Sequence, residues 1–252
     1  MTKAFKDRFS HQAAQYSLYR PHYPETLFSY LVSLVTERNA AWDCATGNGQ
    51  SASSLAESFS QVYATDASSR QIAHAIRKPN IFYSVSPAEK TSLPDRSVDL
   101  VTVAQAIHWF DTESFYREVR RVLKNNGVFA AWAYHLPIIE PEIDRIIHQF
   151  YSVTLEKFWE KEIRHIQSGY RTLLFPFPEI SHPSFSITTA WSFHQVVGYL
   201  ETWSALNVCR ITEGNNPLDA ILPELSMQWK NPEEIKKTEW PIMLKVALHT
   251  ES

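Results

Sequence analysis

The chain has 252 residues, of which 44% are hydrophobic and 13% aromatic, and its formal net charge is −3 at pH 7. This composition excludes wholesale disorder, and the absence of a basic stripe argues against nucleic acid as a partner. No apolar run reaches the about 18 residues that a membrane span needs. Cys44 and Cys209 lie far apart, which favours a reducing, cytoplasmic location without a disulfide.

The first two thirds of the chain alternate between short apolar runs and amphipathic segments. The apolar runs predict buried strands at Ala40–Cys44, Val62–Thr65, Ile81–Val85, Val98–Ala104 and Val128–Tyr134. The amphipathic segments predict helices at Pro24–Val35, Gln50–Phe59 and Asp111–Lys124, the last with Asp111 as its N-cap. Strands that are apolar throughout and alternate with helices imply a parallel sheet covered on both faces.

After Tyr134 the pattern becomes less regular. The segments expected here are a long helix at Pro141–His165, a strand at Ser184–Trp191, a helix at His194–Leu206 and a last strand at Glu239–His249. The charged pairs Glu233-Glu234 and Lys236-Lys237 are interpreted as solvent-exposed surface. The α/β core therefore carries a helical cover near its C-terminal end.

A glycine-containing loop follows the first predicted strand and opens a helix. Gly47 and Gly49 allow the backbone to turn tightly and to approach a ligand closely. Together with Ala52 they also fit the G-x-G-x-x-A pattern of dinucleotide binders. A turn that holds no ligand is a further alternative for the loop taken alone.

Two carboxylates each end a predicted strand beside this loop. Asp43 precedes the glycines, where it can hold the cationic amino end of an amino-acid-like ligand. Asp66 ends the second strand, where an acid hydrogen-bonds ribose hydroxyls in doubly wound folds. The alternative for Asp66 is to cap a helix at Ala67–Ile76. Because both acids end strands, a ligand site is the favoured interpretation.

The spacing Asp43-x-Ala45-x-Gly47-x-Gly49 resembles the D/E-x-G-x-G-x-G loop of class I S-adenosylmethionine methyltransferases. The resemblance continues, in order, through Ala64–Ser68, Pro87–Glu89, Leu93–Leu100, Ala104–Phe110 and Arg121–Gly127. The chain is most similar to the trans-aconitate methyltransferase-like (methyltransferase type 11) branch, on Phe9, Tyr16, Arg20–Pro24, His108–Phe110, Trp203–Ala205 and Trp240-Pro241. The likeness is strongest in residues 1–135 and thin from 136 to 185.

The resemblance implies an α/β, Rossmann-like fold: a doubly wound, mostly parallel seven-stranded sheet with a helical cover or lid inserted after the fifth strand. It implies an enzyme that transfers a methyl group from S-adenosylmethionine to a small-molecule acceptor, a carboxylate or another metabolite, by direct displacement and releases S-adenosylhomocysteine. The expected divisions of the single domain 1–252 are an N-terminal cap (1–36), a cofactor-binding core (37–135), a substrate cover (136–238) with a sixth strand near 184–191, and a last strand (239–249).

The resemblance also places residues against the cofactor. The implied binding residues are Tyr16, Arg20, Asp43, Ala45, Gly47, Gly49, Asp66, Ala67, Ala88, Glu89, Ala104, Gln105, His108 and Trp109. In this arrangement Asp43 lies near the methionyl amino group, Arg20 near the methionyl carboxylate and Asp66 at the ribose hydroxyls.

The remaining implied contacts belong to the adenine and the sulfonium. Ala67 borders the adenine, and the backbone at Ala88 and Glu89 meets its edge. Ala104 and Gln105 lie beneath the sulfonium.

Two positions depart from the family pattern. Ala45 replaces the usual first glycine, and Pro87 stands where many relatives have an acid that accepts a hydrogen bond from the adenine amino group. The second departure shifts adenine recognition towards backbone groups. These departures keep a non-catalytic methyltransferase-like binding protein open as an alternative. The glycine loop keeps open a less favoured one, an NAD(P)-dependent oxidoreductase.

His108 and His135 are the candidates for a catalytic base. His108 begins the aromatic box His108-Trp109-Phe110, which follows the fourth strand. This box either faces the sulfonium cation or packs the next helix onto the sheet. His135 follows the fifth strand and faces either the acceptor or solvent. Displacement from a sulfonium needs alignment and exclusion of water, and it needs a base only where the acceptor must lose a proton.

The expected acceptor pocket lies outside the regular βα repeat. We expect the segment Tyr16–Tyr23 and the cover after Tyr134 to close it, because displacement needs a water-poor chamber above the methyl group. No histidine or cysteine spacing indicates a metal site.

Overall fold

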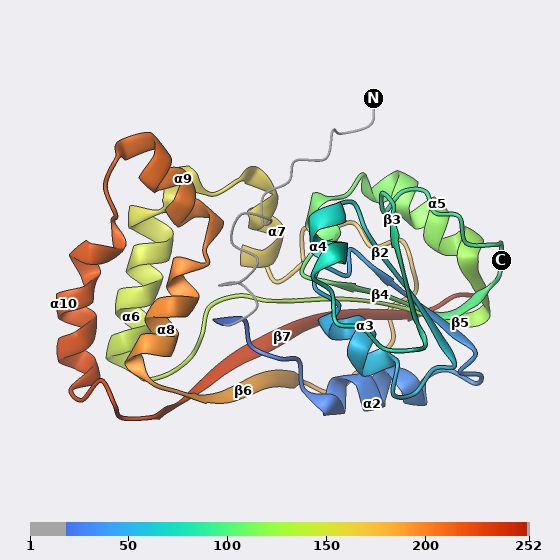
Figure 1. Cartoon of the computed structure of the whole chain (residues 1–252), viewed down its shortest axis with the longest axis horizontal. Coiled ribbons are helices and arrows are strands. Elements are labelled where there is room, and N and C mark those ends of the chain that lie inside the picture. The colour runs from blue at the N-terminus through green and yellow to red at the C-terminus, as the bar shows by residue number, and fades with distance from the viewer. Residues whose placement is uncertain (1–18, 251–252) are drawn as a thin grey trace.

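The computed structural model describes residues 19–250, and its centre is a seven-stranded sheet (Figure 1). The strands are β1 (Ala40–Cys44), β2 (Gln61–Asp66), β3 (Ile81–Val85), β4 (Val98–Ala104), β5 (Leu123–Tyr134), β6 (Phe185–Trp191) and β7 (Lys236–Leu248). They pair in the order β3-β2-β1-β4-β5-β7-β6. The first five strands run parallel, and β7 is antiparallel to both β5 and β6. The predicted doubly wound, mostly parallel sheet is confirmed.

Helices cover both faces of this sheet. The elements of this layer are α2 (Glu25–Ser33), α3 (Gln50–Leu55), α4 (Ser69–Ala73), the 3-10 turn η2 (Ile107–Trp109) and α5 (Thr112–Val122). Helices α2 and α3 lie on one face and α5 on the other (Figure 1). Successive strand residues point to opposite faces, so Val128 packs with α2 and α3, whereas Phe129 packs with α5. Asp111 accepts a hydrogen bond from the Ser114 backbone N–H, which confirms it as the N-cap of α5.

The cover is a second group of helices beside the sheet (Figure 1). Its elements are α6 (Pro141–Gln149), the π-helical turn η3 (Phe150–Thr154), the 3-10 turns η4 (Glu156–Phe158) and η5 (Lys161–Ile163), α7 (Arg164–Gln167), α8 (Phe193–Glu201), α9 (Ser204–Glu213) and α10 (Leu218–Trp229). The cover has its own hydrophobic cluster, which includes the buried rings of Tyr199, Trp229 and Trp240. It follows β5 as predicted, and β6 interrupts it at the position expected for the sixth strand.

The single helix predicted at Pro141–His165 is wrong. The α-helix ends at Gln149, and a π-helical turn follows in which the Leu155 N–H donates to the Phe150 carbonyl at 3.0 Å. The indole Nε1 of Trp159 donates to the Tyr151 carbonyl at 3.0 Å, so a side chain satisfies a group that a continuing helix would use. The helix predicted at His194–Leu206 also breaks, because Trp203 is extended and separates α8 from α9.

The last strand begins at Lys236, earlier than the expected Glu239. Lys236 is buried, and its ammonium lies 2.7 Å from a carboxylate oxygen of Glu140 and 3.1 Å from one of Glu234. The prediction of a solvated surface is therefore wrong for Lys236, although its neighbour Lys237 is exposed. These ion pairs connect the start of β7 to the segment that precedes α6.

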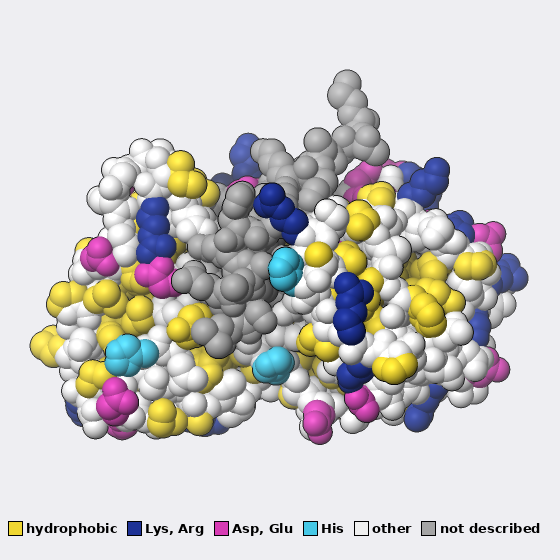
Figure 2. All heavy atoms as spheres, in the orientation of Figure 1, with side chains coloured by type: hydrophobic (Ala, Val, Ile, Leu, Met, Phe, Trp, Pro, Cys, Tyr) yellow, Lys and Arg dark blue, Asp and Glu magenta, His cyan; other side chains and the backbone are white. Residues whose placement is uncertain are grey.

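The outer surface has a mixed charge. On the face shown in Figure 2, basic and acidic side chains alternate among the described residues, in line with the small net charge of −3. Within residues 19–250, no helix is both long enough and apolar enough to cross a membrane.

Candidate functional site

The loop between β1 and α3 turns through three residues with left-handed backbone, Ala45 (φ 53°), Gly47 (φ 57°) and Gly49 (φ 84°). An alanine rarely adopts this conformation, yet Ala45 does, so this position keeps the left-handed backbone that a glycine adopts readily. A Cβ added at Gly47 would meet no atom within 4 Å. The space beside Gly47 is therefore open, which fits a backbone that cradles a ligand.

Gly49 is required for a different reason. A Cβ at this position would lie 2.3 Å from the hydroxyl oxygen of Tyr83, which donates a hydrogen bond to the Ile76 carbonyl. We expect Gly49→Ala to destabilise the fold by about 1–3 kcal/mol, the usual range for overpacking. Urea unfolding measures this loss, and the loss should be smaller in a Tyr83→Phe background. An equal loss in both backgrounds would contradict the assigned clash.

Asp43, the residue before the last one of β1, is a buried carboxylate that is 1% exposed. Thr46 Oγ1 donates to it at 2.5 Å and Thr102 Oγ1 at 2.8 Å. Burial raises the pKa of Asp43 to about 6, although both hydroxyl donors lower it, and the charge of nearby Asp66 raises it further. An ionised acid in this position is stabilised by a cation, so the geometry fits an ammonium group as its partner.

In the ligand-free protein, Asp43→Asn should remove the free-energy cost of burying an ionised carboxylate. The folded-state pKa of about 6 exceeds the ordinary value of 3.8, so the folded state binds the proton more tightly, and stability falls as the pH rises between these values. The melting temperature of Asp43→Asn should therefore exceed that of the wild type at about pH 8, with a smaller difference at about pH 4.5. Calorimetry should also show weaker binding of S-adenosylhomocysteine. A pH-independent difference in melting temperature would contradict the prediction.

Asp66 joins the end of β2 to the glycine loop. Its Oδ2 accepts a hydrogen bond from the Gly47 N–H at 2.9 Å, and its Oδ1 accepts one from the Ser68 N–H at 2.8 Å. The alternative in which Asp66 caps the following helix is wrong, because the N-cap of α4 is Ser68, whose hydroxyl accepts from the Gln71 N–H. Asp66 thus fixes the backbone of the glycine loop, which is predicted to bind a ligand.

The other implied cofactor residues follow neighbouring strands. Ala67 follows β2, Ala88 and Glu89 follow β3, and Ala104 ends β4, so all lie at the carboxyl edge of the sheet, where ligands of such folds bind. Glu89 accepts a hydrogen bond from the Asp111 N–H at 3.0 Å, which uses one of its oxygens within the protein. Gln105, which has a left-handed backbone, donates from Nε2 to the Tyr134 carbonyl at 3.1 Å.

Of the two residues of the N-terminal cap, Tyr16 lies outside the described residues. Arg20 is described, and its Nη1 donates to the Tyr134 hydroxyl at 3.2 Å. The centre of its guanidinium lies 5.4 Å from the ring centroid of Tyr199. Arg20 therefore connects the end of β5 to helix α8 of the cover.

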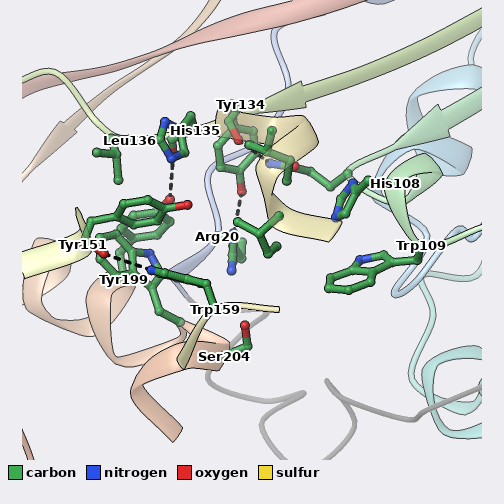
Figure 3. A pocket seen from close by; sticks show the side chains of 14 residues that line it. Arg20, His108, Trp109, Tyr134, His135, Leu136, Tyr151, Trp159, Tyr199 and Ser204 are labelled. Atoms are coloured by element: carbon green, nitrogen blue, oxygen red, sulfur yellow. Dashed lines mark hydrogen bonds between the residues drawn. The ribbon is translucent and has the colours of Figure 1, made fainter. Parts of the chain in front are cut away.

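A pocket of about 90 Å³ lies between the core and the cover (Figure 3). It is lined by Arg20, Gln105, His108, Trp109, Tyr134, His135, Leu136, Tyr151, Trp159, Ile163, Ile166, Tyr199, Trp203 and Ser204. Figure 3 shows His108 and Trp109 on one side and Tyr151, Trp159 and Tyr199 on the other. The pocket thus joins residues of the predicted aromatic box to residues of the cover.

The two candidate histidines differ in their surroundings. His108 is 5% exposed, its Nδ1 lies 3.2 Å from the Tyr170 hydroxyl, and its ring packs against Trp109. The ring of His135 meets Tyr151 edge to face at 4.7 Å. Burial lowers the pKa of His135 to about 4, and the charge of His148 lowers it further, so His135 is neutral near pH 7.

Sequence reasoning missed the pocket residues Tyr151, Tyr199 and Ser204. Tyr151 enters the pocket through the π-helical turn that replaces the predicted helix, and Ser204 begins α9 at the helix break after Trp203. Neither irregularity has a local sequence signal. Among residues 19–250 no cluster of three histidine, cysteine or acidic residues could hold a metal ion.

Comparison with known proteins identifies the family. Residues 42–131 match the family model of a methyltransferase domain. A Dictyostelium discoideum protein described as a methyltransferase is 34% identical over 225 residues, which cover 88% of this chain and 84% of the relative. The Saccharomyces cerevisiae protein CRG1, described as an S-adenosylmethionine-dependent methyltransferase, is 30% identical over 140 residues, or 52% of this chain and 47% of CRG1.

A solved structure agrees with these relatives. A protein from Anaeromyxobacter dehalogenans, described as a type II methyltransferase, is 42% identical and superposes with a TM-score of 0.86, covering 92% of this chain and 99% of that chain. The chain belongs to the class I S-adenosylmethionine-dependent methyltransferases. This assignment replaces both alternatives left open by the sequence, the oxidoreductase and the non-catalytic binding protein.

Proposed function

We propose that this enzyme binds S-adenosylmethionine along the carboxyl edge of the sheet and methylates a small molecule held in the pocket under the cover. The observation that carries the proposal is the pocket of about 90 Å³, which residues of the core and the cover line together. A chamber of this size accepts a small molecule more readily than the surface of a folded macromolecule.

The proposed cofactor contacts follow the geometry of the loop and the strand ends. The methionyl part lies beside Gly47, where the space is open, with its amino group near Asp43 and its carboxylate near Arg20. The ribose lies at Asp66. Support for the amino contact comes from the buried Asp43 carboxylate, whose raised pKa a neighbouring cation would lower.

The remaining contacts surround the adenine and the reacting methyl group. Ala67 and the backbone at Ala88 and Glu89 border the adenine. Ala104 and Gln105 lie beneath the sulfonium. When bound, the cofactor supplies an electrophilic methyl group on a positively charged sulfur.

The residues of the chain then act by orientation and by exclusion of water. Trp109 presents an aromatic surface towards the sulfonium, to which a cation is attracted. Tyr151, Trp159 and Trp203 close the opposite wall and reduce the access of water to the reacting atoms. Holding the nucleophile in line contributes roughly 7–11 kcal/mol in favourable cases, so a displacement of this kind does not require a catalytic dyad.

The finer assignments stay predictions. They are the trans-aconitate-like branch, the acceptor as a carboxylate or another metabolite, the cytoplasmic location and the exclusion of nucleic acid as a partner. Each concerns the acceptor or the surroundings of the enzyme rather than the cofactor site.

Titration calorimetry followed by a labelled-methyl screen tests the proposal. S-adenosylhomocysteine should bind to the protein and NAD should not. With a labelled donor and a metabolite extract, the label should appear in a small molecule. Label that appears only in protein or nucleic acid would contradict a small-molecule acceptor.

A further inference from the structure

The wall that the cover contributes to the pocket is aromatic. The ring centroids of Tyr151 and Trp159 lie 4.5 Å apart. The ring centroid of Trp203 lies 5.5 Å from that of Tyr151 and 5.8 Å from that of Trp159. Tyr199 adds a fourth ring, 6.0 Å from Trp203. Aromatic faces and edges pack best against another planar ring, in offset or edge-to-face arrangements. This wall therefore favours a flat, unsaturated acceptor.

The charge of the wall limits the acceptor further. Among the described residues that line the pocket, none is an aspartate or a glutamate, and Arg20 is the one with a fixed charge. The guanidinium of Arg20 stays beside the pocket through Tyr134 and the Tyr199 ring. An acceptor that enters as an ammonium ion would find no carboxylate side chain among these residues to pair with.

His135 contributes a polar atom with no partner. Its Nε2 is buried and makes no hydrogen bond to any residue of the described chain. A buried polar atom without a partner is costly and calls for an explanation such as a ligand. In the tautomer with the proton on Nδ1, Nε2 has a lone pair that can accept a proton.

Residues of the cover surround His135, which directly follows β5. The Tyr151 ring packs against it edge to face, and His148 on α6 acts on it electrostatically. The Tyr199 hydroxyl donates to the backbone carbonyl of His135 at 3.4 Å and therefore does not occupy Nε2. These contacts keep the imidazole neutral and in place without satisfying Nε2.

We propose that the acceptor is a planar aromatic molecule that is methylated on a hydroxyl oxygen, with His135 Nε2 as the proton acceptor. The inference rests on the proposed function. In the reaction the oxygen forms a bond to the methyl carbon while the bond from that carbon to sulfur breaks. Sulfur leaves as a neutral thioether, and the hydroxyl proton passes to His135 Nε2, which becomes an imidazolium.

Other classes of acceptor give His135 Nε2 less of a role. A carboxylate is already ionised near neutral pH and needs no base, so it gives His135 Nε2 no role. A phenolic hydroxyl has a pKa near 10 and is protonated at neutral pH. Its proton becomes acidic as the oxygen bonds to the methyl carbon, so a base as weak as His135, with a pKa of about 4, suffices.

Four probes of similar size distinguish the acceptor classes: 4-methylphenol, 4-methylbenzoate, 4-methylaniline and 4-methylcyclohexanol. Each is offered at millimolar concentration with labelled S-adenosylmethionine, and products are identified by mass spectrometry. We expect O-methylation of 4-methylphenol at a rate at least tenfold above that of the other three. Preference for another probe, or transfer to none of them by a protein that binds S-adenosylmethionine, overturns the acceptor assignment. Failure to bind S-adenosylmethionine would instead overturn the proposed function.

The role of His135 has its own test. His135→Asn should lower the rate with 4-methylphenol at least tenfold and leave the dissociation constant of S-adenosylhomocysteine unchanged. The loss should be smaller with 4-nitrophenol, a phenol acidic enough to ionise near neutral pH. The matched control is His194→Asn, because His194 is an exposed histidine of cover helix α8 that does not line the pocket.

Two further measurements separate catalysis from structure. Melting temperatures show whether each variant folds, and His135→Ala with added imidazole replaces the lost base in a second variant. Recovery of 4-methylphenol methylation by imidazole supports the proposal. If a folded His135→Asn variant loses equal rate with both phenols, and a folded His135→Ala variant gains nothing from imidazole, His135 is not the proton acceptor.

Discussion

Gly47→Val is expected to abolish cofactor binding without unfolding the protein. A Cβ at Gly47 meets no protein atom within 4 Å, so the valine side chain would occupy the space proposed for the methionyl group. The left-handed backbone at φ 57° adds strain of about 1–2 kcal/mol for a residue with a side chain. We expect the dissociation constant of S-adenosylhomocysteine to rise at least about 100-fold, or about 2.7 kcal/mol, as measured by titration calorimetry.

The matched control for this substitution is Gly214→Val. Gly214 also has a left-handed backbone, at φ 71°, and a Cβ there also meets nothing within 4 Å. It ends α9 and does not line the pocket, so its substitution introduces the same strain without touching the proposed site. Both variants should show similar small losses in melting temperature, and only Gly47→Val should lose binding. Normal binding by Gly47→Val would remove the loop from the cofactor site.

The centre of the sheet could be predicted from the sequence because β1 and β4 are buried on both faces. The prediction of a buried strand is wrong for β3, which lies at the edge of the sheet and has only Ile81 buried. The observed bounds of β1, β3 and β4 match the predicted apolar runs, and every residue of β1 is buried. A strand between two covered faces needs apolar residues at successive positions, and this requirement is visible locally. The length of β5 was underestimated because its first residues, Leu123–Gly127, include polar side chains.

The cover could not be predicted in the same way. Its helix breaks depend on contacts between residues distant from each other, such as the buried cluster that joins Phe150 of η3 to Trp203 between α8 and α9. Lys236 was misjudged for a similar reason, since its partner Glu140 lies 96 positions away in the chain. Amphipathic periodicity shows that a segment packs against another element, but it does not show which element that is.

The candidate site likewise has one part that the sequence predicts and one part that it does not. Asp43 and Asp66 lie at the carboxyl ends of β1 and β2, and Gly47 is in the loop after β1. Parallel strands bring their carboxyl ends to one edge of the sheet, so the proximity of these residues follows from topology. The hydrogen bond from Gly47 to Asp66 shows that they meet. The pocket walls at Tyr151 and Tyr199 depend on how the cover packs against the core, for which the sequence has no repeat or motif.

Asp66→Ala is expected to weaken S-adenosylhomocysteine binding by about 1–3 kcal/mol, the scale for losing hydrogen bonds to a charged group. Two effects contribute, because Asp66 is proposed to bind the ribose hydroxyls and it also holds the Gly47 N–H. A 2′-deoxy analogue of S-adenosylhomocysteine separates them. The analogue should bind the wild type more weakly than the parent compound, and this difference should shrink in Asp66→Ala, as a double-mutant cycle requires for interacting groups.

Asp99→Ala is the control for the structural part of this effect. Asp99 is also a buried carboxylate that accepts backbone hydrogen bonds, from the N–H groups of Asn39 and Ala40 at 2.9 Å each. It lies at the start of β4, at the edge of the sheet opposite to Asp66. We expect Asp99→Ala to lower the melting temperature and to leave the affinity for S-adenosylhomocysteine unchanged. If Asp66→Ala also kept its affinity in a folded protein, or if the deoxy analogue lost the same affinity in both backgrounds, Asp66 would not contact the ribose and would serve only to hold the glycine loop.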